Sequence, residues 1–342
     1  LSEYKKIADS KGASTFVGYT QIESEATING ILVDGLSVQS ATSGSEVEIV
    51  LDRTPFYAEG GGQLADGGRI TLASGAIVEI DDVQTPVNGL SVHRGRIISG
   101  EVTLGSKAQA EIDLERRNAI SRAHTATHMV HKAFREILGE TATQAGSENS
   151  PGRFRFDFPS TGAVPDSVLN EVESRVNTLL LDNLAVTAET MSQDAAKKIG
   201  AMALFGEKYG DQVRVVSVGD WARELCGGTH VSASGQLGVI KLLSESSVGA
   251  GVRRVEALVG VDAYKYLARE HLLLNSLTEI IKGARAEELP ERISDLLTKI
   301  KEIEKELAMV RSAQAMSQIG ALAEQALTIN GLSVIATALS DG

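Results

Sequence analysis

The chain has 342 residues, of which 42% are apolar and 23% charged, and its formal net charge is −12. Such a composition is typical of folded globular proteins, and it excludes a disordered chain and a uniformly basic coat for nucleic acid, although not a local basic site. The single cysteine excludes an internal disulfide framework and fits a reducing cytosol, so we expect a cytoplasmic protein. We expect neither a membrane span nor an export leader. Because the first residue is Leu1, we expect part of a longer protein.

The first third of the chain predicts a small antiparallel β-barrel. Residues 1–12 are typical of the end of a helix or a linker. Short apolar alternations then recur between Gly, Asn and Ser turns, for example at 28–33 and 47–51. We therefore assign residues 1–110 to a barrel domain that carries a glycine-rich loop.

The middle of the chain interleaves helices and strands, and it opens with a long helix expected at 113–139. Asp113 can cap this helix, apolar residues recur at helical spacing, and Gly139 is a natural stop. The elements expected after it are strands at 154–158, 213–218, 238–247 and 252–259, and helices at 168–184 and 193–203. We assign residues 111–260 to one α/β domain, so that the chain as a whole is of the α+β class.

Two long helices are expected at 262–282 and 287–323, separated by a break between Gly283 and Pro290. The second carries apolar residues at the a and d spacing of a heptad, namely Ile293, Leu296, Ile300, Ile303, Leu307 and Val310. We predict an antiparallel helical hairpin over 261–328 in preference to a self-associating coiled coil. Asn330 and Gly331 end the second helix, and 332–339 is expected to be the first strand of a truncated domain at 329–342.

The strongest chemical signal is a pair of histidine motifs. His124 and His128 lie one helical turn apart, so both imidazoles can bind one metal ion. Cys226 and His230 flank two glycines that permit a tight bend. Three imidazoles and one thiolate suit a tetrahedral Zn²⁺ ion. His131 lies on nearly the same helix face as His128 and is an alternative to His124.

Two weaker signals accompany these motifs. Three successive glycines, Gly60 to Gly62, lie in the segment 53–66 and indicate either a loop that approaches a ligand closely or a tight barrel corner. Polar residues at 144–147, followed by Arg153 and Arg155, can line a pocket near the histidine helix. The remaining histidines, His93 and His271, are expected at the surface.

Taken together, these segments resemble the editing half of the alanyl-tRNA synthetase family. The resemblance rests on 53–66, 121–128, 144–147, 153–158 and 226–230, in that order, and it covers essentially the whole chain. Threonyl-tRNA synthetases share the histidine and cysteine pattern but not the glycine-rich segment and barrel. The helical region would then be the family's linker to a C-terminal domain.

The resemblance implies a zinc-containing editing domain that hydrolyses the ester of mischarged seryl- or glycyl-tRNA(Ala). It implies one Zn²⁺ ion on His124, His128, Cys226 and His230, and it gives Thr127 and Gln144 catalytic roles, Thr127 as the reader of the serine hydroxyl. The residues that it implies for substrate binding are Gly60, Gly61, Gly62, Gln63, Arg153 and Arg155. We further expect Arg116, Arg117 and Arg122 to meet tRNA phosphates.

The same resemblance implies that the intact protein attaches alanine to tRNA(Ala) with ATP and Mg²⁺, in a domain that these residues do not include. Self-association through the helical region is possible in that intact protein. Two alternatives stay open: a free-standing deacylase that edits in trans, and a non-catalytic, zinc-stabilised module that binds tRNA.

Overall fold

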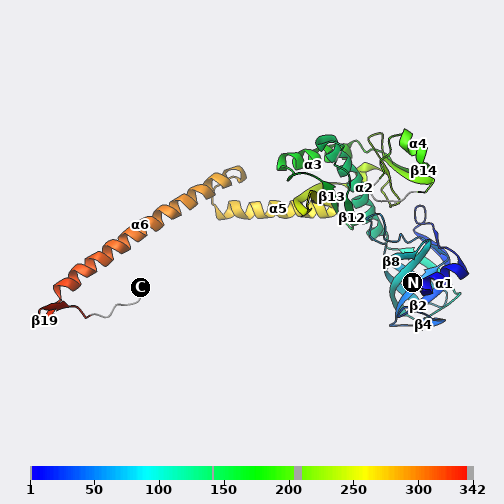
Figure 1. The fold of residues 1–342 in the computed structure, drawn as a ribbon, viewed down its shortest axis with the longest axis horizontal. Helices are drawn as coiled ribbons and strands as arrows, with labels where there is room; N and C mark the ends of the chain where they lie inside the picture. Colours follow the sequence, from blue (N-terminus) through cyan, green and yellow to red (C-terminus); the bar gives the residue numbers. More distant parts are fainter. Residues whose placement is uncertain (1, 141, 204–209, 337–342) are drawn as a thin grey trace. The chain divides into compact units, whose positions relative to one another are not determined.

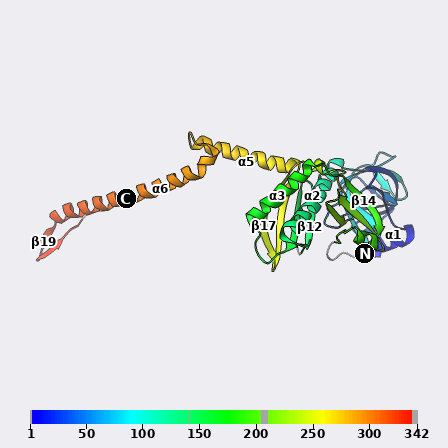
Figure 2. The ribbon, with the colours of Figure 1, turned by 90° about the horizontal axis from the view of Figure 1, so that it is seen from above.

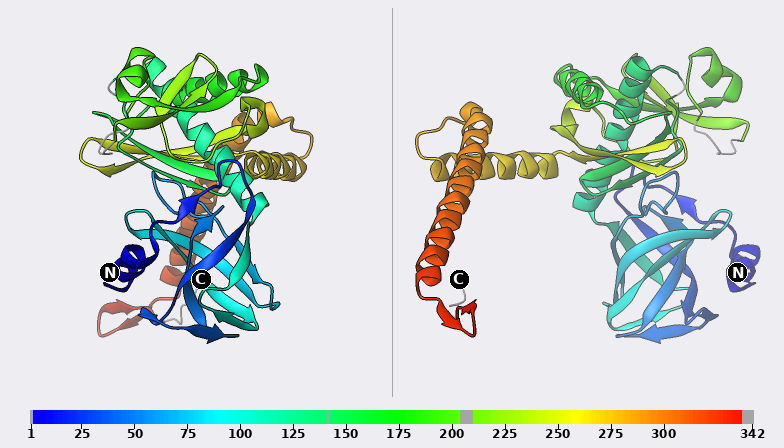
Figure 3. Two further views of the ribbon diagram at one scale, coloured as in Figure 1. Left: turned by 90° about the vertical axis from the view of Figure 1, so that its right-hand side faces the viewer. Right: turned by 60° about the vertical axis from the view of Figure 1, so that its left-hand side comes forward.

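The computed structural model describes residues 2–140, 142–203 and 210–336, which divide into two compact units, Leu1–Tyr266 and Leu267–Gly342. The first unit contains the barrel and the α/β region, which lie against each other (Figure 3). Within the described ranges, no helix is both long enough and apolar enough to cross a membrane.

The expected antiparallel barrel is confirmed (Figure 1). Its sheet closes because the last strand, β11, pairs with the first, β2, and the buried alternate residues of the strands form the barrel core. The strands around the barrel are β11 (Lys107–Ile112), β7 (Gly68–Leu72), β8 (Ile77–Val87), β9 (Leu90–Ser99), β5 (Glu46–Leu51) and β2 (Glu23–Val33). Short additions are β3 (Leu36–Ser37) on β2, β1 (Thr15–Phe16) with β6 (Arg53–Thr54), and β4 (Ser40–Thr42) with β10 (Glu101–Thr103). Helix α1 (Ser2–Lys11) packs on the barrel through Ile7.

The α/β region is built on an antiparallel four-stranded sheet that contacts two helices (Figure 2). The sheet order is β12 (Gly146–Ser150), β13 (Arg153–Pro159), β18 (Val252–Val259) and β17 (Ile240–Gly249), and the helices are α2 (Leu114–Leu138) and α3 (Asp166–Leu181). The alternation in β13 buries Phe154, Phe156 and Phe158 in one core with the apolar faces of both helices. That core fixes the position of α2, the helix that carries the histidine pair.

A second, three-stranded sheet lies after α3, in the order β14 (Val186–Ser192), β15 (Gln212–Val218) and β16 (Ala222–Leu225). The helix expected at 193–203 is shorter, because α4 ends at Lys198 (Gln193–Lys198). A short 3-10 helix at Ser234–Leu237 precedes β17. The sequence analysis did not predict β14 or β16, and β16 leads directly into Cys226.

The two long helices are observed as α5 (Val261–Ile280) and α6 (Leu289–Glu324), joined through a 3-10 turn at Ala286–Glu288. The expected packed hairpin is not seen among the described residues. The heptad side chains of α6 that should face a partner helix are exposed, from 37% at Ile293 to 60% at Val310. The strand expected at 332–339 is β20 (Leu332–Val334), which pairs with β19 (Leu327–Ile329), and positions 337–339 lie outside the described residues.

Candidate metal centre

Helix α2 places two imidazoles one above the other. The Asp113 carboxylate caps the helix by accepting a hydrogen bond from the Arg116 backbone N–H at 3.0 Å, and the helix stops at Gly139 as predicted. The rings of His124 and His128 stack with centroids 5.1 Å apart. Both side chains are buried, so their ring nitrogens need partners inside the protein.

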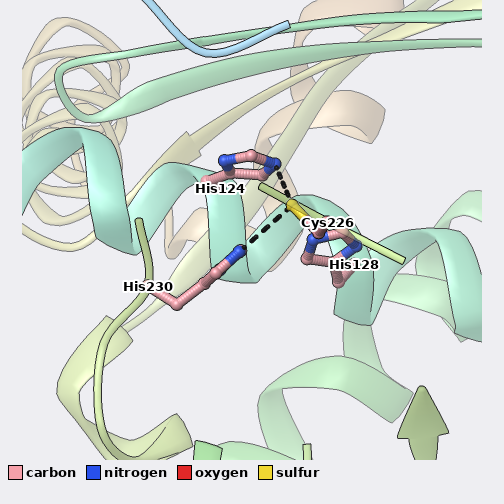
Figure 4. Close-up of side chains that lie close together, drawn as sticks. All are labelled: His124, His128, Cys226 and His230. Carbon is pink, nitrogen blue, oxygen red and sulfur yellow. Dashed lines mark hydrogen bonds between the residues drawn. The ribbon is translucent and has the colours of Figure 1, made fainter. Parts of the chain in front are cut away.

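The other two donors come from the segment that follows β16 (Figure 4). A Cβ at Gly228 would lie 2.1 Å from the His124 ring and 2.8 Å from Gln63, so only glycine permits this close approach. Arg214 holds the bend by donating to the carbonyls of Cys226 and Gly228 at 2.9 and 2.8 Å. The bend thereby brings Cys226 and His230 close to the two α2 imidazoles.

One ligand atom from each of His124, His128, Cys226 and His230 lies within 4.8 Å of the others. The Cys226 sulfur is 3.4 Å from His124 Nε2 and 3.3 Å from His230 Nε2. Tetrahedral Zn²⁺ with Zn–S of about 2.3 Å and Zn–N of about 2.0–2.1 Å requires an S···N separation of about 3.5 Å. The buried Nε2 of His128 has no hydrogen-bond partner within the described chain. The donor set, the spacing and this unpaired nitrogen therefore fit a zinc ion, and His131 is not part of the cluster.

Hydrogen bonds at the far ring nitrogens set the tautomer of each histidine. His124 Nδ1 donates to Gln63 Oε1 at 2.8 Å, since that oxygen also accepts from the Thr229 backbone N–H. His128 Nδ1 bonds to the Glu224 carboxylate. His230 Nδ1 is 3.1 Å from Thr125 Oγ1, whose own proton goes to the Ser121 carbonyl. Each histidine therefore presents Nε2 to the common centre.

The cluster shifts the acidity of its members. Burial alone would raise the pKa of the Cys226 thiol, but His124, His128 and His230 hold it well below its usual value. Burial would lower the pKa of His128, but the charges of Glu224 and then Cys226 raise it to about 10. Burial lowers the pKa of His230 to about 3. At neutral pH and without an ion, His230 is therefore neutral, whereas His128 is protonated and must release a proton before its Nε2 can ligate a metal.

A cavity of about 320 Å³ opens beside His230, between the barrel and the α/β region. Its lining includes Tyr19, Asn118 and Ser121. The Tyr19 hydroxyl donates to the Gly227 carbonyl at 2.5 Å, and the Arg214 guanidinium lies 4.0 Å from the centre of the Tyr19 ring. His124, His128 and Cys226 are buried, so His230 is the side of the cluster that faces this cavity.

Thr127 and Gln144, which the resemblance made catalytic, are not among the four clustered residues. The buried Thr127 hydroxyl lies 2.6 Å from Asn149 Oδ1 and 3.0 Å from the Ala123 carbonyl, and it can donate its single proton to either acceptor. The half-buried Gln144 donates to Ser147 Oγ at 2.9 Å. Both contacts lead towards β12, where the glycine-rich loop also packs.

The glycine-rich loop reaches the cluster through a single side chain. Gly60 and Gly61 are exposed, and the carbonyl of Gly62 accepts from the Asn149 backbone N–H at 2.7 Å. Gln63 is fully buried and bonds both His124 and Thr229. The motif was visible in the sequence, but the contact of Gln63 with a histidine on α2 was not.

Several expected surface residues are engaged elsewhere. Arg153 pairs with Glu256, and Arg155 pairs with Glu148 at 2.9 Å, on the sheet surface and away from the cluster. The expectation that Arg117 meets phosphate was wrong, because Arg117 is buried and donates to Asp66 and to the carbonyls of Gly18 and Pro55. The expectation that His93 lies at the surface was also wrong, because it is buried in the barrel, whereas His271 is exposed.

Glu224, Thr125 and Arg214 belong to no motif that the sequence alone makes visible. Glu224 precedes Cys226 by two residues, so the two side chains lie on one face of an extended segment, and this spacing was the available signal.

Two family descriptions match this chain. Residues 2–116 match "tRNA synthetases class II (A)", and residues 213–256, which contain Glu224 and the Cys226–His230 bend, match "Threonyl and Alanyl tRNA synthetase second additional domain". Both descriptions are of aminoacyl-tRNA synthetases, so this is the class of protein that the chain resembles.

Comparison with individual proteins identifies the family within this class. The chain is 62% identical to an alanine–tRNA ligase of a Nocardioides species over 98% of its length, and 56% and 51% identical to those of Streptomyces avermitilis and Saccharopolyspora erythraea over 100% of its length. It spans 37–38% of the length of these three relatives. The chain belongs to the alanyl-tRNA synthetase family.

Proposed function

We propose that this chain carries the proofreading reaction of its family, the hydrolysis of the ester that joins serine or glycine to the 3′ end of tRNA(Ala). The observation that carries the proposal is the buried cluster of three histidines and one cysteine, whose His230 faces a cavity. The match of residues 213–256 to the second additional domain supports it. We propose further that the full-length protein attaches alanine to tRNA(Ala) with ATP and Mg²⁺ and acts in the cytoplasm.

A second site is needed because the substrates differ so little. A pocket for alanine cannot exclude the smaller glycine by size, and serine adds one hydroxyl. A difference of this size is worth about 1–3 kcal/mol, which is too little for accurate translation. A site that hydrogen-bonds the serine hydroxyl can spare alanine, since alanine leaves that partner unpaired.

In this proposal His124, His128, Cys226 and His230 hold one Zn²⁺ ion. Four protein ligands would fill a tetrahedral site, so the ion would supply Lewis-acid chemistry to the aminoacyl group only if one ligand yields, and would otherwise hold the site together. Residues of the chain orient the ligands and bind the rest of the substrate. Gln63, Glu224 and Thr125 fix the imidazoles, and the cavity beside His230 admits the terminal nucleoside between Tyr19 and Asn118.

We propose Thr127 as the reader of the serine hydroxyl and Gln144 as the group that places the ester or the attacking water. Thr127 is one residue before His128, and its hydroxyl now bonds Ala123 and Asn149. To read serine it must exchange one of these bonds for the substrate. We propose roles in tRNA binding for Arg153, Arg155 and the exposed Gly60 and Gly61, on the strength of the family resemblance.

The test is deacylation of seryl-, glycyl- and alanyl-tRNA(Ala) measured side by side, with zinc content determined for each protein. We expect the wild type to clear the first two and spare the third. Cys226→Ser should lose most of its zinc and its deacylation, because it removes the only soft ligand. Zinc bound without any hydrolysis would favour the non-catalytic tRNA-binding module.

Thr127→Val tests recognition within the same assay. We expect roughly tenfold slower hydrolysis of seryl-tRNA, the value of about 1–1.5 kcal/mol for a net hydrogen bond, and a smaller loss on glycyl-tRNA. Thr178→Val is the matched control, since Thr178 also bonds back to its own helix, at Ser174, but lies on α3. Equal losses on all substrates would assign Thr127 to helix structure alone.

A further inference from the structure

The Glu224 carboxylate lies between two buried imidazoles. One oxygen, Oε2, bonds His128 Nδ1, and the other, Oε1, bonds His131 Nδ1 at 2.7 Å. All three side chains are at least 96% buried. A carboxylate so far from water is stable only with partners for both oxygens, and here two histidines on α2 provide them.

Strand β16 delivers this carboxylate and the cysteine together. The strand pairs with β15 from Ala222 to Leu225, and the Cys226 backbone N–H continues the pairing by donating to the Arg214 carbonyl at 3.0 Å. Because alternate residues of a strand share a face, Glu224 and Cys226 both point towards α2. One short strand therefore supplies a ligand atom and the acceptor that orients another ligand.

We propose that Glu224 is a positioning residue of the metal centre, which keeps the proton of His128 on Nδ1 and turns Nε2 towards the ion. The inference rests on the metal site proposed above and adds a residue to it. His128 Nε2 is buried without a partner in the described chain, as this arrangement requires. The negative charge of Glu224 also increases the donor strength of the imidazole, as carboxylates behind metal-bound histidines do.

A purely structural role for Glu224 is the competing explanation. The bond to His131 joins β16 to α2 without involving a ligand, and His131 packs on Phe156 at a ring separation of 5.2 Å. If the only role of Glu224 were to join β16 to α2 through His131, removing His131 would disturb the metal centre as much as removing Glu224. If Glu224 acts through His128, the loss of His131 should leave metal affinity nearly unchanged.

The experiment measures zinc affinity by chelator competition on the whole chain, with the fold of each metal-free protein checked by circular dichroism. We expect Glu224→Ala to bind zinc about 10–100-fold more weakly, and Glu224→Gln, which keeps an acceptor but no charge, about 3–10-fold more weakly. His131→Leu should stay within about threefold of the wild type. Glu173→Ala is the matched control, because it removes a carboxylate that bonds Lys241 and Leu242 away from the cluster.

Cobalt substitution gives a second readout. The thiolate-to-cobalt absorption band should persist in Glu224→Gln, since all four ligands remain, while its cobalt titration shifts to higher concentration. Zinc affinity equal to wild type in both Glu224 variants would overturn the proposal, as would an equal loss in His131→Leu. If Glu224→Ala does not fold, the Glu224→Gln titration decides alone. A wild type that binds no zinc, or a Cys226→Ser variant that binds it normally, would instead refute the metal site itself.

Discussion

His93 is a histidine that the barrel keeps neutral. Its Nδ1 is 2.9 Å from the Ile49 carbonyl, which can only accept, so Nδ1 carries the proton. Its Nε2 therefore accepts from the Thr54 hydroxyl at 2.7 Å, and the ring packs edge-on against Phe56. Burial lowers the pKa of His93 to about 4, although the bond to Ile49 opposes the shift. Both ring nitrogens thus have partners in the neutral form.

This shift predicts a loss of stability in acid. Between pH 6.5 and pH 4 the unfolded chain binds a proton at His93 that the folded protein does not, so the free energy of unfolding falls as the pH falls. The loss at pH 4 should be about 3 kcal/mol. Urea unfolding should be measured from pH 7 to pH 4. Over this range the free energy of unfolding should fall by this additional amount in the wild type and not in His93→Gln. Parallel pH profiles for the two proteins would contradict it.

The glycine-rich loop supports the cluster as a whole element, because its packing places one side chain against a histidine. Gly62 has φ +77°, and a Cβ there would lie 2.4 Å from Ser147 Oγ and 2.7 Å from the Ser147 carbonyl oxygen. The loop can therefore lie against β12 only with glycine at this position. The next residue, Gln63, then enters the interior and bonds His124. The barrel thus contributes a side chain to the histidine and cysteine cluster of the α/β region.

Two loop substitutions test this contribution. Gln63→Ala and Gly62→Ala should each weaken zinc binding by roughly tenfold, because one removes and the other displaces the acceptor for His124 Nδ1. Gly75→Ala is the matched control, since Gly75 is also a barrel glycine with positive φ but has nothing within 4 Å of its added Cβ. We expect that control to lose stability through backbone strain while its zinc affinity, measured by chelator competition, stays at the wild-type value. Equal zinc affinity in all three variants would show that the loop does not support the centre.

Many of the helices and strands can be predicted from the sequence, and those that cannot have features that explain why. The helix expected at 113–139 matches α2 within one residue at each end, because a capping aspartate and a terminal glycine mark its limits. Strand β12 resembles a polar loop in sequence, since Gly146–Ser150 has no apolar residue and is a strand only by pairing with β13. Strand β16 has four residues, too few for a clear alternation. Glu224 was therefore overlooked, while the four proposed metal ligands were found from residue type and spacing alone.

At the scale of the whole molecule, the two units differ in how their apolar residues are used. The four hydrophobic clusters of the described residues are built from residues up to Val259. In α6, by contrast, the heptad residues that predicted a hairpin are exposed, among them Ile300 at 50% and Ile303 at 53%. The heptad pattern correctly indicated a helix, but it does not state whether a facing helix is present. The stability of the metal centre should accordingly depend on the first unit.

We predict that residues 1–266 fold and bind zinc without the rest of the chain. The His and Cys cluster, Gln63, Glu224 and the cores that hold them all lie within Leu1–Tyr266. We expect the fragment to bind zinc within about twofold of the full chain. A second fragment, 1–280, keeps all of α5 and serves as the control for the cut inside that helix. Zinc binding by 1–280 but not by 1–266 would show that α5 beyond Tyr266 supports the centre, and failure of both fragments would assign that support to residues 281–342.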